Sequence, residues 1–455
     1  MPDSKKIKWV TLLTALLLLF ILYINPESVI VLSIVNLGSL LLLGNSVRLI
    51  QGKLLSPFLL IAASLYVFHS GHLWLSLLNV DPASFLLSFD WYKASNIHYI
   101  IETYTGITSL LIIFMTVGVL TIKPIVPENE TDITNYYVTN YFKFGFIVLY
   151  LLAFYFEAGR AINVSNSGYG DGYHYSSSIA QYIVFSVEVL LLMLLYIYRK
   201  NPKQFKFYLF LDFAKIFFVM FFVGNRGTSV INLLIILFII TNYSYLAYDQ
   251  RKLKRIILSV FAFLLVALPF ISATRGERSN MGITEFVNTS SPIESFLEEF
   301  GGTVYNVFLT QDYISAIGSA HGLQILGTTL SIFPGSTMLF GDIITKNVSI
   351  GSMLNIYNNR QGLGGSMIAQ LYFNFGESFF LYISIAIVAL VVSLISNKLM
   401  KGNMGLYKTI LLLSLFSGFM TFVRGEWYDV VTEVKVCAYL IILLYTFRSQ
   451  LFIKG

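Results

Sequence analysis

Six arginines near the ends of long apolar runs are the residues whose type and setting suggest chemistry. They are Arg160, Arg226, Arg275, Arg278, Arg360 and Arg424. Three of them precede a glycine, in NRG, TRG and VRG, and a fourth follows Gly159. Glycine lets a backbone or a ligand approach closely, and the planar guanidinium binds phosphate through two parallel hydrogen bonds. The set predicts a site for a phosphate or pyrophosphate group.

The composition indicates which kind of element must position these arginines. Of the 455 residues, 56% are hydrophobic and 12% are charged, and the mean hydropathy is +0.73. A soluble domain carries roughly 25% charged residues. The chain is therefore expected to be a polytopic membrane protein, surrounded by lipid and without a nucleic-acid partner. Cys437 is the only cysteine, so no intrachain disulfide can form.

Twelve apolar runs are long enough to cross a bilayer, which needs about 20 residues per helix. They lie near residues 8–24, 28–47, 55–78, 99–122, 142–158, 178–198, 205–223, 227–247, 256–273, 366–396, 407–423 and 431–447. The run 366–396 is too long for one plain span, so we expect it to begin as an interfacial helix or to tilt. The first run has no small-residue cleavage site and predicts an uncleaved anchor. Together the runs predict an all-α polytopic fold, with residues 1–455 as a single membrane domain.

The positions of the basic residues predict the orientation. Cytoplasmic loops of membrane proteins are enriched in Lys and Arg. With the N-terminus in the cytoplasm, every second connection is basic, including RKNPKQFK at 199–206 and DQRKLKR at 249–255. Both termini are therefore predicted to be cytoplasmic. The largest outer connection, 274–365, is Gly-rich and moderately apolar, which predicts a folded, helix-containing outer subdomain.

Lysine and arginine divide unequally between the two predicted sides. The cytoplasmic set holds 15 Lys and 5 Arg, whereas the outer set holds 2 Lys and the 6 Arg named above. This asymmetry favours a lipid-linked phosphate at the membrane–water boundary as their ligand. The alternative is that each arginine anchors to headgroups or pairs with an outer carboxylate such as Glu277, Glu426 or Asp429.

Transfer to a hydroxyl group needs a general base or a hydrogen-bond acceptor. The outer candidates are Asp171, Glu277, His321, Glu426 and Asp429. We rank His321 and Glu277 first, because histidine has a suitable pKa and Glu277 lies between two arginines that keep it ionised.

Tyrosines alternate with Gly and Asp in NSGYGDGYHYSSS at 166–178. Tyr169 and Tyr173 can stack on sugars, and Asp171 can accept hydrogen bonds from their hydroxyls. The alternative is a flexible outer turn whose tyrosines lie in the interfacial belt.

Some charged residues fall well within the apolar runs, and four of them are singled out. They are Glu188, Asp212, Lys215 and Lys435. Charges at that depth are costly and usually paired. Asp212 and Lys215 are three residues apart, on one helix face. We expect an interhelical ion-pair network that fixes packing, with a proton or ion path as the alternative.

Four stretches of the C-terminal half resemble the Wzy-type polymerases of O-antigen and capsular polysaccharide, and more loosely the enterobacterial common antigen polymerase. They are VGNRGTSVINLL (223–234), SIFPGS (331–336), RQGLGGSMIAQLYFNFGE (360–377) and FVRGEWYDV (422–430). They occur in the family's order, whereas the first 200 residues match only in hydrophobic pattern.

The resemblance implies a fold similar to the GT-C membrane glycosyltransferases and a defined reaction. A growing glycan on undecaprenyl pyrophosphate is transferred en bloc to the terminal sugar hydroxyl of one repeat unit on a second undecaprenyl pyrophosphate. The work is expected on the outer face of the bacterial cytoplasmic membrane, without nucleotide sugar, metal or other cofactor. A chain-length regulator is left open as a partner.

The predicted roles in that reaction follow from the residue types. The catalytic set is Arg226, Arg275, Arg278, Arg424, Glu277 and His321, and the substrate-binding set is Arg160, Arg360, Tyr169, Asp171 and Tyr173. Preorganised arginines would stabilise the departing pyrophosphate. No Asp-x-Asp motif occurs, and the acidic cluster ENETD at 128–132 falls on the predicted cytoplasmic side.

Two alternatives to the polymerase remain open. A ligase that moves finished glycan from the same carrier would need the same donor site and a different acceptor. A flippase for lipid-linked oligosaccharides would have its cationic residues along a central cavity between related halves. The arginines at one membrane face and the large outer connection favour an enzyme.

Overall fold

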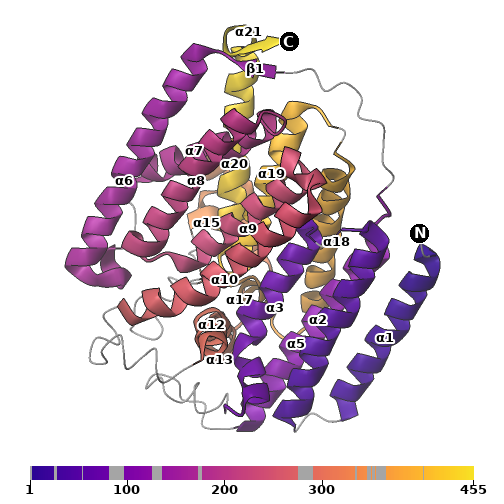
Figure 1. Cartoon of the computed structure of the whole chain (residues 1–455). Coiled ribbons are helices and arrows are strands. Elements are labelled where there is room, and N and C mark those ends of the chain that lie inside the picture. Colours follow the sequence, from indigo (N-terminus) through magenta and orange to yellow (C-terminus); the bar gives the residue numbers. More distant parts are fainter. Residues whose placement is uncertain are drawn as a thin grey trace. The chain divides into compact units, whose positions relative to one another are not determined.

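Helices form at each of the twelve apolar runs in the computed structural model of the chain (Figure 1). The structure describes residues 3–24, 28–53, 55–80, 97–125, 136–172, 177–274, 291–333, 336–345, 350, 354, 365–402 and 404–454. Up to the large connection the helices are α1 (Ser4–Ile24), α2 (Val29–Gln51), α3 (Pro57–Leu75), α5 (Ile97–Thr121), α6 (Asn140–Gly172), α7 (Ser178–Ile197), α8 (Pro202–Phe218), α9 (Arg226–Asn242) and α10 (Gln250–Thr274). After it come α17 (Met367–Phe375), α18 (Phe379–Lys401), α19 (Leu406–Phe422), α20 (Trp427–Thr446) and α21 (Arg448–Leu451).

The connection 274–365 carries helices of its own. They are α12 (Pro292–Gly301), α13 (Tyr305–Ile317), α14 (Leu323–Leu330) and α15 (Ser336–Thr345). The sequence marks the start of α12 clearly. Ser291 and Glu294 form a reciprocal capping box and Pro292 occupies the first turn, where a missing N–H costs nothing.

Among the residues that the structure describes, seven helices are long and apolar enough to cross a membrane by length and composition. They are Ser4–Ile24, Val29–Gln51, Pro57–Leu78, His98–Thr121, Asn140–Asn166, Ile179–Ile197 and Phe379–Lys401. The helices α9 and α19 are shorter apolar helices. The protein is thus a predominantly helical, multi-pass membrane protein in its architecture, and the count of twelve crossings stays a prediction.

The long run 366–396 is divided into two helices, and the interfacial position predicted for its first part stays a prediction. Ser366 caps α17 by accepting a hydrogen bond from the Ala369 N–H at 3.2 Å. Gly376 ends α17 with φ 58° and ψ −159°, a conformation open to glycine and unfavourable for other residues. The membrane-length helix α18 begins only at Phe379.

Two compact units make up the chain, and each is discontinuous in sequence. Unit 1 comprises Met1–Ile125, Val287–Asn397 and Phe419–Asp429. Unit 2 comprises Val126–Phe286, Lys398–Gly418 and Val430–Gly455.

Within unit 1, α1, α2, α3 and α5 pack side by side (Figure 1). α12 lies against α3 with the two backbones nearly touching, because Gly71 and Gly301 face each other without side chains. A Cβ on Gly301 would overlap the backbone nitrogen of His72. The imidazole of His72 bonds the Glu298 carbonyl at 2.8 Å, so this contact is polar as well as close.

Unit 2 contains a feature that the all-helical prediction missed. Strand β1 (Tyr136–Val138) pairs antiparallel with strand β2 (Phe452–Lys454) in a two-stranded sheet. Three residues per strand are too few to show an alternating pattern in the sequence, so this pairing had no signal there.

Candidate functional site

The structure describes the side chains of four of the predicted site residues. They are Arg160 and Arg226 in unit 2 and His321 and Arg424 in unit 1. Arg275, Glu277, Arg278, Arg360 and Tyr173 lie outside the described residues, as do the side chains of Tyr169 and Asp171 at the end of α6. The predicted convergence of the arginines therefore stays a prediction.

Two of the motif-bearing stretches, 360–377 and 422–430, contact each other. We call residues 423–429, which join the end of α19 to the start of α20, the arginine corner. Gly365 approaches Gly425 so closely that a Cβ on Gly365 would lie 2.9 Å from the Gly425 carbonyl and would overlap Glu426. The Met367 N–H also donates to the Val423 carbonyl at 3.5 Å. Gly365 and Gly425 belong to motifs that are distant in sequence. Both positions favour glycine for the same reason, because the two backbones come too close for a side chain.

The two carboxylates of the arginine corner accept hydrogen bonds from backbone N–H groups. Glu426 accepts from the Ile350 N–H at 3.2 Å, and Asp429 accepts from the Glu426 N–H at 2.8 Å. Asp429 precedes the apolar stretch 431–447, and burial in the corner raises its pKa to about 7. These two residues were predicted both as possible ion-pair partners of an arginine and as candidate bases.

Arg424 is half-buried in the same corner, and its guanidinium carbon lies 5.8 Å from the ring centroid of Phe68 on α3. In the part of the chain that the structure describes, no carboxylate forms an ion pair with it. A guanidinium attracted to an aromatic face retains N–H donors for another ligand. Such a group can bind a phosphate through two of those N–H donors.

Buried amides extend from the arginine corner to α14. Gln370 accepts a hydrogen bond from the Trp427 N–H at 2.6 Å and donates to Gln324 at 3.2 Å. Asn374 donates to the same Gln324 oxygen at 3.0 Å, and the Trp427 indole donates to Thr329 at 2.8 Å. Hydrogen bonds to residues of α14 and α17 therefore fix the position of the arginine corner.

A buried histidine and serine fix the start of α17 to α3. Nδ1 of His69 lies 3.0 Å from the Leu65 carbonyl, so this nitrogen carries the proton and Nε2 accepts from the Ser366 hydroxyl at 2.8 Å. Sequence reasoning missed His69, Gln324, Ser366 and Gln370. The signal was present, since VFHSGHLW at 67–74 puts histidine in an apolar run and Gln370 and Asn374 are four residues apart on one helix face.

His321 is exposed and lies between α13 and α14. Its backbone adopts a left-handed conformation with φ 50°, which few non-glycine residues occupy. Nδ1 lies 3.3 Å from the Ser319 hydroxyl. An exposed imidazole at a turn is accessible to a sugar hydroxyl, and the predicted role as a base is not excluded by its packing.

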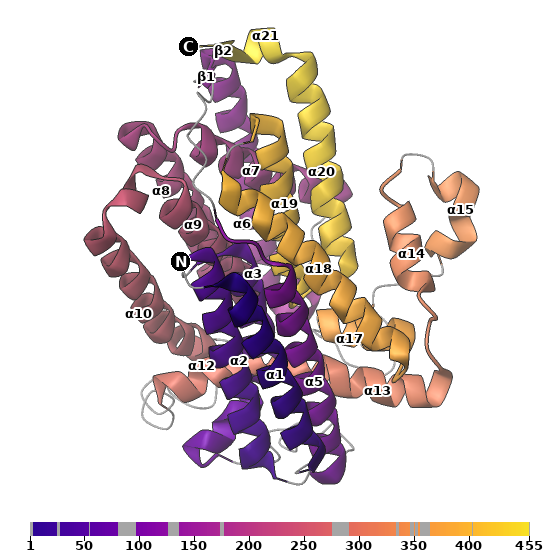
Figure 2. The same cartoon turned by 90° about the vertical axis from the view of Figure 1, so that its right-hand side faces the viewer.

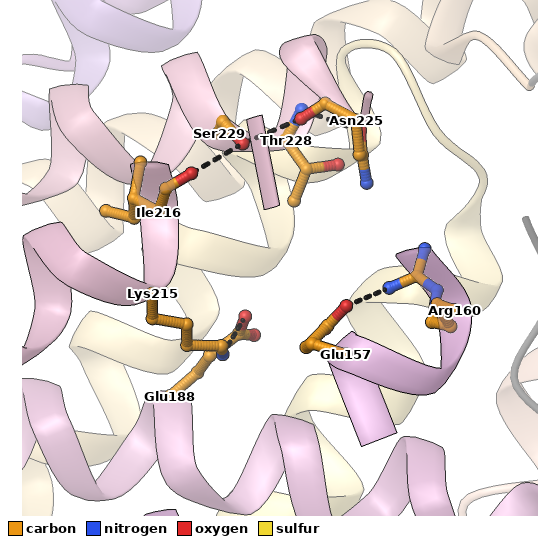
Figure 3. A network of polar contacts seen from close by, with 8 residues as sticks. All are labelled: Glu157, Arg160, Glu188, Lys215, Ile216, Asn225, Thr228 and Ser229. Atoms are coloured by element: carbon orange, nitrogen blue, oxygen red, sulfur yellow. Dashed lines mark hydrogen bonds and ion pairs between the residues drawn. The ribbon is translucent and has the colours of Figure 1, made fainter. Parts of the chain in front are cut away.

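Arg226, in unit 2, is buried as the first residue of α9, after a π-helical turn at Val219–Val223. Gly224 reverses the chain with φ 76°, and Asn225 caps α9 by accepting from the Thr228 N–H at 3.4 Å. The Ser229 hydroxyl donates to the Asn225 carbonyl at 2.7 Å (Figure 3). The GNRG sequence at 224–227 thus forms a helix start that is fixed by hydrogen bonds. Single π-helical turns such as Val219–Val223 occur often at functional sites.

Among the described arginines that were predicted to bind phosphate, Arg160 best fits the alternative, in which the arginine pairs with a carboxylate. It is buried on α6 and pairs with Glu157, one turn earlier, at 2.8 Å (Figure 3). A phosphate bound by Arg160 would compete with this carboxylate, so its contribution to binding is expected to be smaller than that of Arg424.

One ion pair between charges inside the apolar helices of unit 2 is present, whereas the wider network stays a prediction. Lys215 on α8 contacts Glu188 on α7 at 2.7 Å (Figure 3). Asp212 is buried one turn before Lys215 on the same helix. The pair joins neighbouring helices within unit 2, which fits a role in packing.

The family comparison covers nearly the whole chain. A family profile described as O-antigen polysaccharide polymerase Wzy matches residues 7–454. The match includes the first 200 residues, where the sequence by itself had indicated only a hydrophobic pattern. No curated protein and no solved structure matches the chain. The protein belongs to the O-antigen polysaccharide polymerase Wzy family and is, on that ground, a membrane glycosyltransferase-type polymerase that acts on lipid-linked oligosaccharide repeat units.

Proposed function

We propose that the protein transfers a growing glycan en bloc from undecaprenyl pyrophosphate onto the terminal sugar hydroxyl of a repeat unit on a second undecaprenyl pyrophosphate. The reaction takes place on the outer face of the bacterial cytoplasmic membrane. The bond between the anomeric carbon and the pyrophosphate oxygen breaks, and a glycosidic bond to the acceptor oxygen forms. A base takes the proton of the acceptor hydroxyl, and the pyrophosphate leaves with the electron pair.

The observation that carries this proposal is the setting of Arg424. Its guanidinium lies over Phe68, while Glu426 and Asp429 beside it accept hydrogen bonds from backbone N–H groups. A half-buried cation without an ion-pair partner among the described residues suits an anionic ligand at the membrane boundary. Negative charge grows on the pyrophosphate as the bond breaks, so a preorganised guanidinium stabilises the transition state more than the ground state.

The remaining arginines complete the proposed site. Arg226, Arg275 and Arg278 act with Arg424 on the pyrophosphate, and Arg160 and Arg360 bind the carrier or glycan. With two or three guanidinium groups on the leaving group, the reaction needs no Mg²⁺. His321 and Glu277 are the proposed bases, and Tyr169, Asp171 and Tyr173 contact the glycan.

The test uses purified protein, synthetic undecaprenyl-pyrophosphate repeat unit and EDTA, with products resolved by gel or mass spectrometry. Wild-type protein should give a ladder of products. Arg424→Lys keeps the charge but loses the bidentate fork, and should lower the rate by roughly 100-fold, the scale of losing one oxyanion donor.

A matched control is Arg448→Lys. Arg448 also lies over an aromatic ring, at 4.9 Å from the centroid of Tyr445, but belongs to the predicted cytoplasmic end of the chain. This variant should keep the wild-type ladder. Equal losses in both variants would contradict a specific role for Arg424. Transbilayer movement of the lipid without a ladder would identify a flippase, and transfer only to a different acceptor would identify a ligase.

A further inference from the structure

The helical hairpin α14–α15 has its polar and apolar sides reversed relative to an element that faces water. On α14, Gln324 is 2% exposed, whereas Leu323 and Leu326 on the other side are exposed. On α15, Ser336 is buried, whereas Met338 is 91% and Leu339 80% exposed. Helices of water-soluble surfaces bury the apolar side and expose the polar one. Figure 2 shows the two helices together, projecting away from α17 and α18 of the same unit.

The inward polar side of α14 forms hydrogen bonds with other residues of unit 1. Gln324 accepts from both Gln370 and Asn374, and the Ile325 N–H donates to the Asn374 oxygen at 3.3 Å. Asn374 lies just before the start of the membrane-length helix α18 at Phe379. The base of the hairpin is therefore fixed at the level where a span enters the bilayer.

The sequence of this segment is free of formal charge through α14 and the first six residues of α15. From Tyr313 to Gly341 there is no Asp, Glu, Lys or Arg, and the charged residues Asp312 and Asp342 flank the stretch. Both the connection 79–98 and the connection 249–255 carry charges. An uncharged stretch beside a span, with leucine, methionine and phenylalanine outward, has the composition of a surface in hydrocarbon.

We propose that the α14–α15 hairpin inserts its outward apolar side, Leu323, Leu326, Phe333, Met338 and Leu339, into the hydrocarbon of the membrane leaflet on the side of the large connection. The exposure of these residues matches that of lipid-facing residues on the spans, such as Leu13 on α1 at 64%. These five side chains carry no charge and no hydrogen-bonding group, which suits hydrocarbon as their surroundings. Burying them in the leaflet removes apolar surface from water that would otherwise stay exposed.

Site-directed fluorescence in proteoliposomes tests the insertion. The only native cysteine, Cys437, is buried, so wild-type protein serves as the unlabelled blank. Leu339→Cys and Met338→Cys are labelled with an NBD maleimide. Leu13→Cys reports the bilayer, and Lys252→Cys, whose side chain is 67% exposed, reports water. Size-exclusion profiles identical to wild type confirm that each variant is folded.

Insertion predicts that NBD at positions 338 and 339 emits at the short wavelength of position 13 and is quenched by phospholipids with nitroxides on their acyl chains. Iodide in the buffer should leave this emission unchanged while it quenches position 252. Emission and iodide quenching like those of position 252 at both hairpin positions would overturn the proposal. The outcome is independent of whether the protein polymerises glycan, because no substrate enters the measurement.

Discussion

Two arginines of similar predicted role have different surroundings in the structure. Arg160 is neutralised by Glu157 at 2.8 Å, whereas Arg424 lies over Phe68, and the carboxylates beside it accept from backbone N–H groups. Sequence alone could not separate these cases, because both arginines stand beside glycine at the end of an apolar run. We therefore expect the neighbouring carboxylates to decide, residue by residue, which of the arginines can bind a phosphate.

His321 provides a prediction about the base. Replacing it by Asn removes the imidazole but keeps a residue that tolerates the left-handed backbone. If His321 removes the acceptor proton, the initial polymerisation rate should fall roughly 100- to 10,000-fold. The rate is measured in the ladder assay, with Ser319→Ala as the control for the neighbouring turn. An unchanged rate in His321→Asn would transfer the role to a carboxylate.

Asp429 gives a prediction about pH. Its pKa of about 7 lies above the 3.8 that is usual for an aspartate carboxyl, so the folded state holds the proton more tightly than the unfolded state. The stability from this group is complete below pH 4 and decreases as the pH rises towards 7. Asp429→Asn should therefore melt at a higher temperature than wild type at pH 8, with the difference smaller at pH 5. A difference that does not change with pH would contradict this protonation state.

At the scale of elements, the sequence predicted the helices well and their interruptions poorly. The runs 8–24 and 178–198 correspond to α1 and α7 within a few residues, because apolar length alone defines a span. The division of 366–396 depends on Gly376 and on the capping Ser366. The mean hydropathy of a long run does not reveal such single residues. The corner at Arg424 was found from its motif, but its amide contacts join distant segments and have no local sequence signal.

The ion pair between α7 and α8 gives a prediction about helix packing. Lys215→Met leaves Glu188 without this partner and should cost about 3 kcal/mol, the lower end for a buried pair because Glu188 is partly exposed. The combined variant Glu188→Leu, Lys215→Met should recover most of that loss. Unfolding is followed by thermal denaturation in detergent. A combined variant that is stable yet inactive would instead favour a proton or ion path.

For the whole molecule, hydrogen bonds support the alternation of sides. Lys8 donates to the Leu120 carbonyl at 2.7 Å, and the Lys123 N–H donates to Asn397 at 2.9 Å. These contacts join ends that were all predicted to be cytoplasmic. His72 and Glu298, by contrast, join two predicted outer ends. Such contacts require that each pair shares one side of the membrane.

Labelling in cells tests which side that is. Lys252→Cys lies in the predicted cytoplasmic connection, and Ala316→Cys is exposed in the predicted outer subdomain. A membrane-impermeant maleimide should label position 316 in cells whose inner membrane is intact, and position 252 only after that membrane is permeabilised. The reverse pattern would invert the topology and place Arg424 on the cytoplasmic side.

The strand pair of unit 2 has a consequence for how the protein is made. Tyr136 is paired with Lys454, so the strand formed early in translation has no partner until the residues that follow α21 have been made. Helices up to α19 can enter the membrane one after another while this edge stays open. Completion of unit 2 therefore waits for β2, so a structure that begins at β1 closes only after all the intervening helices have been made.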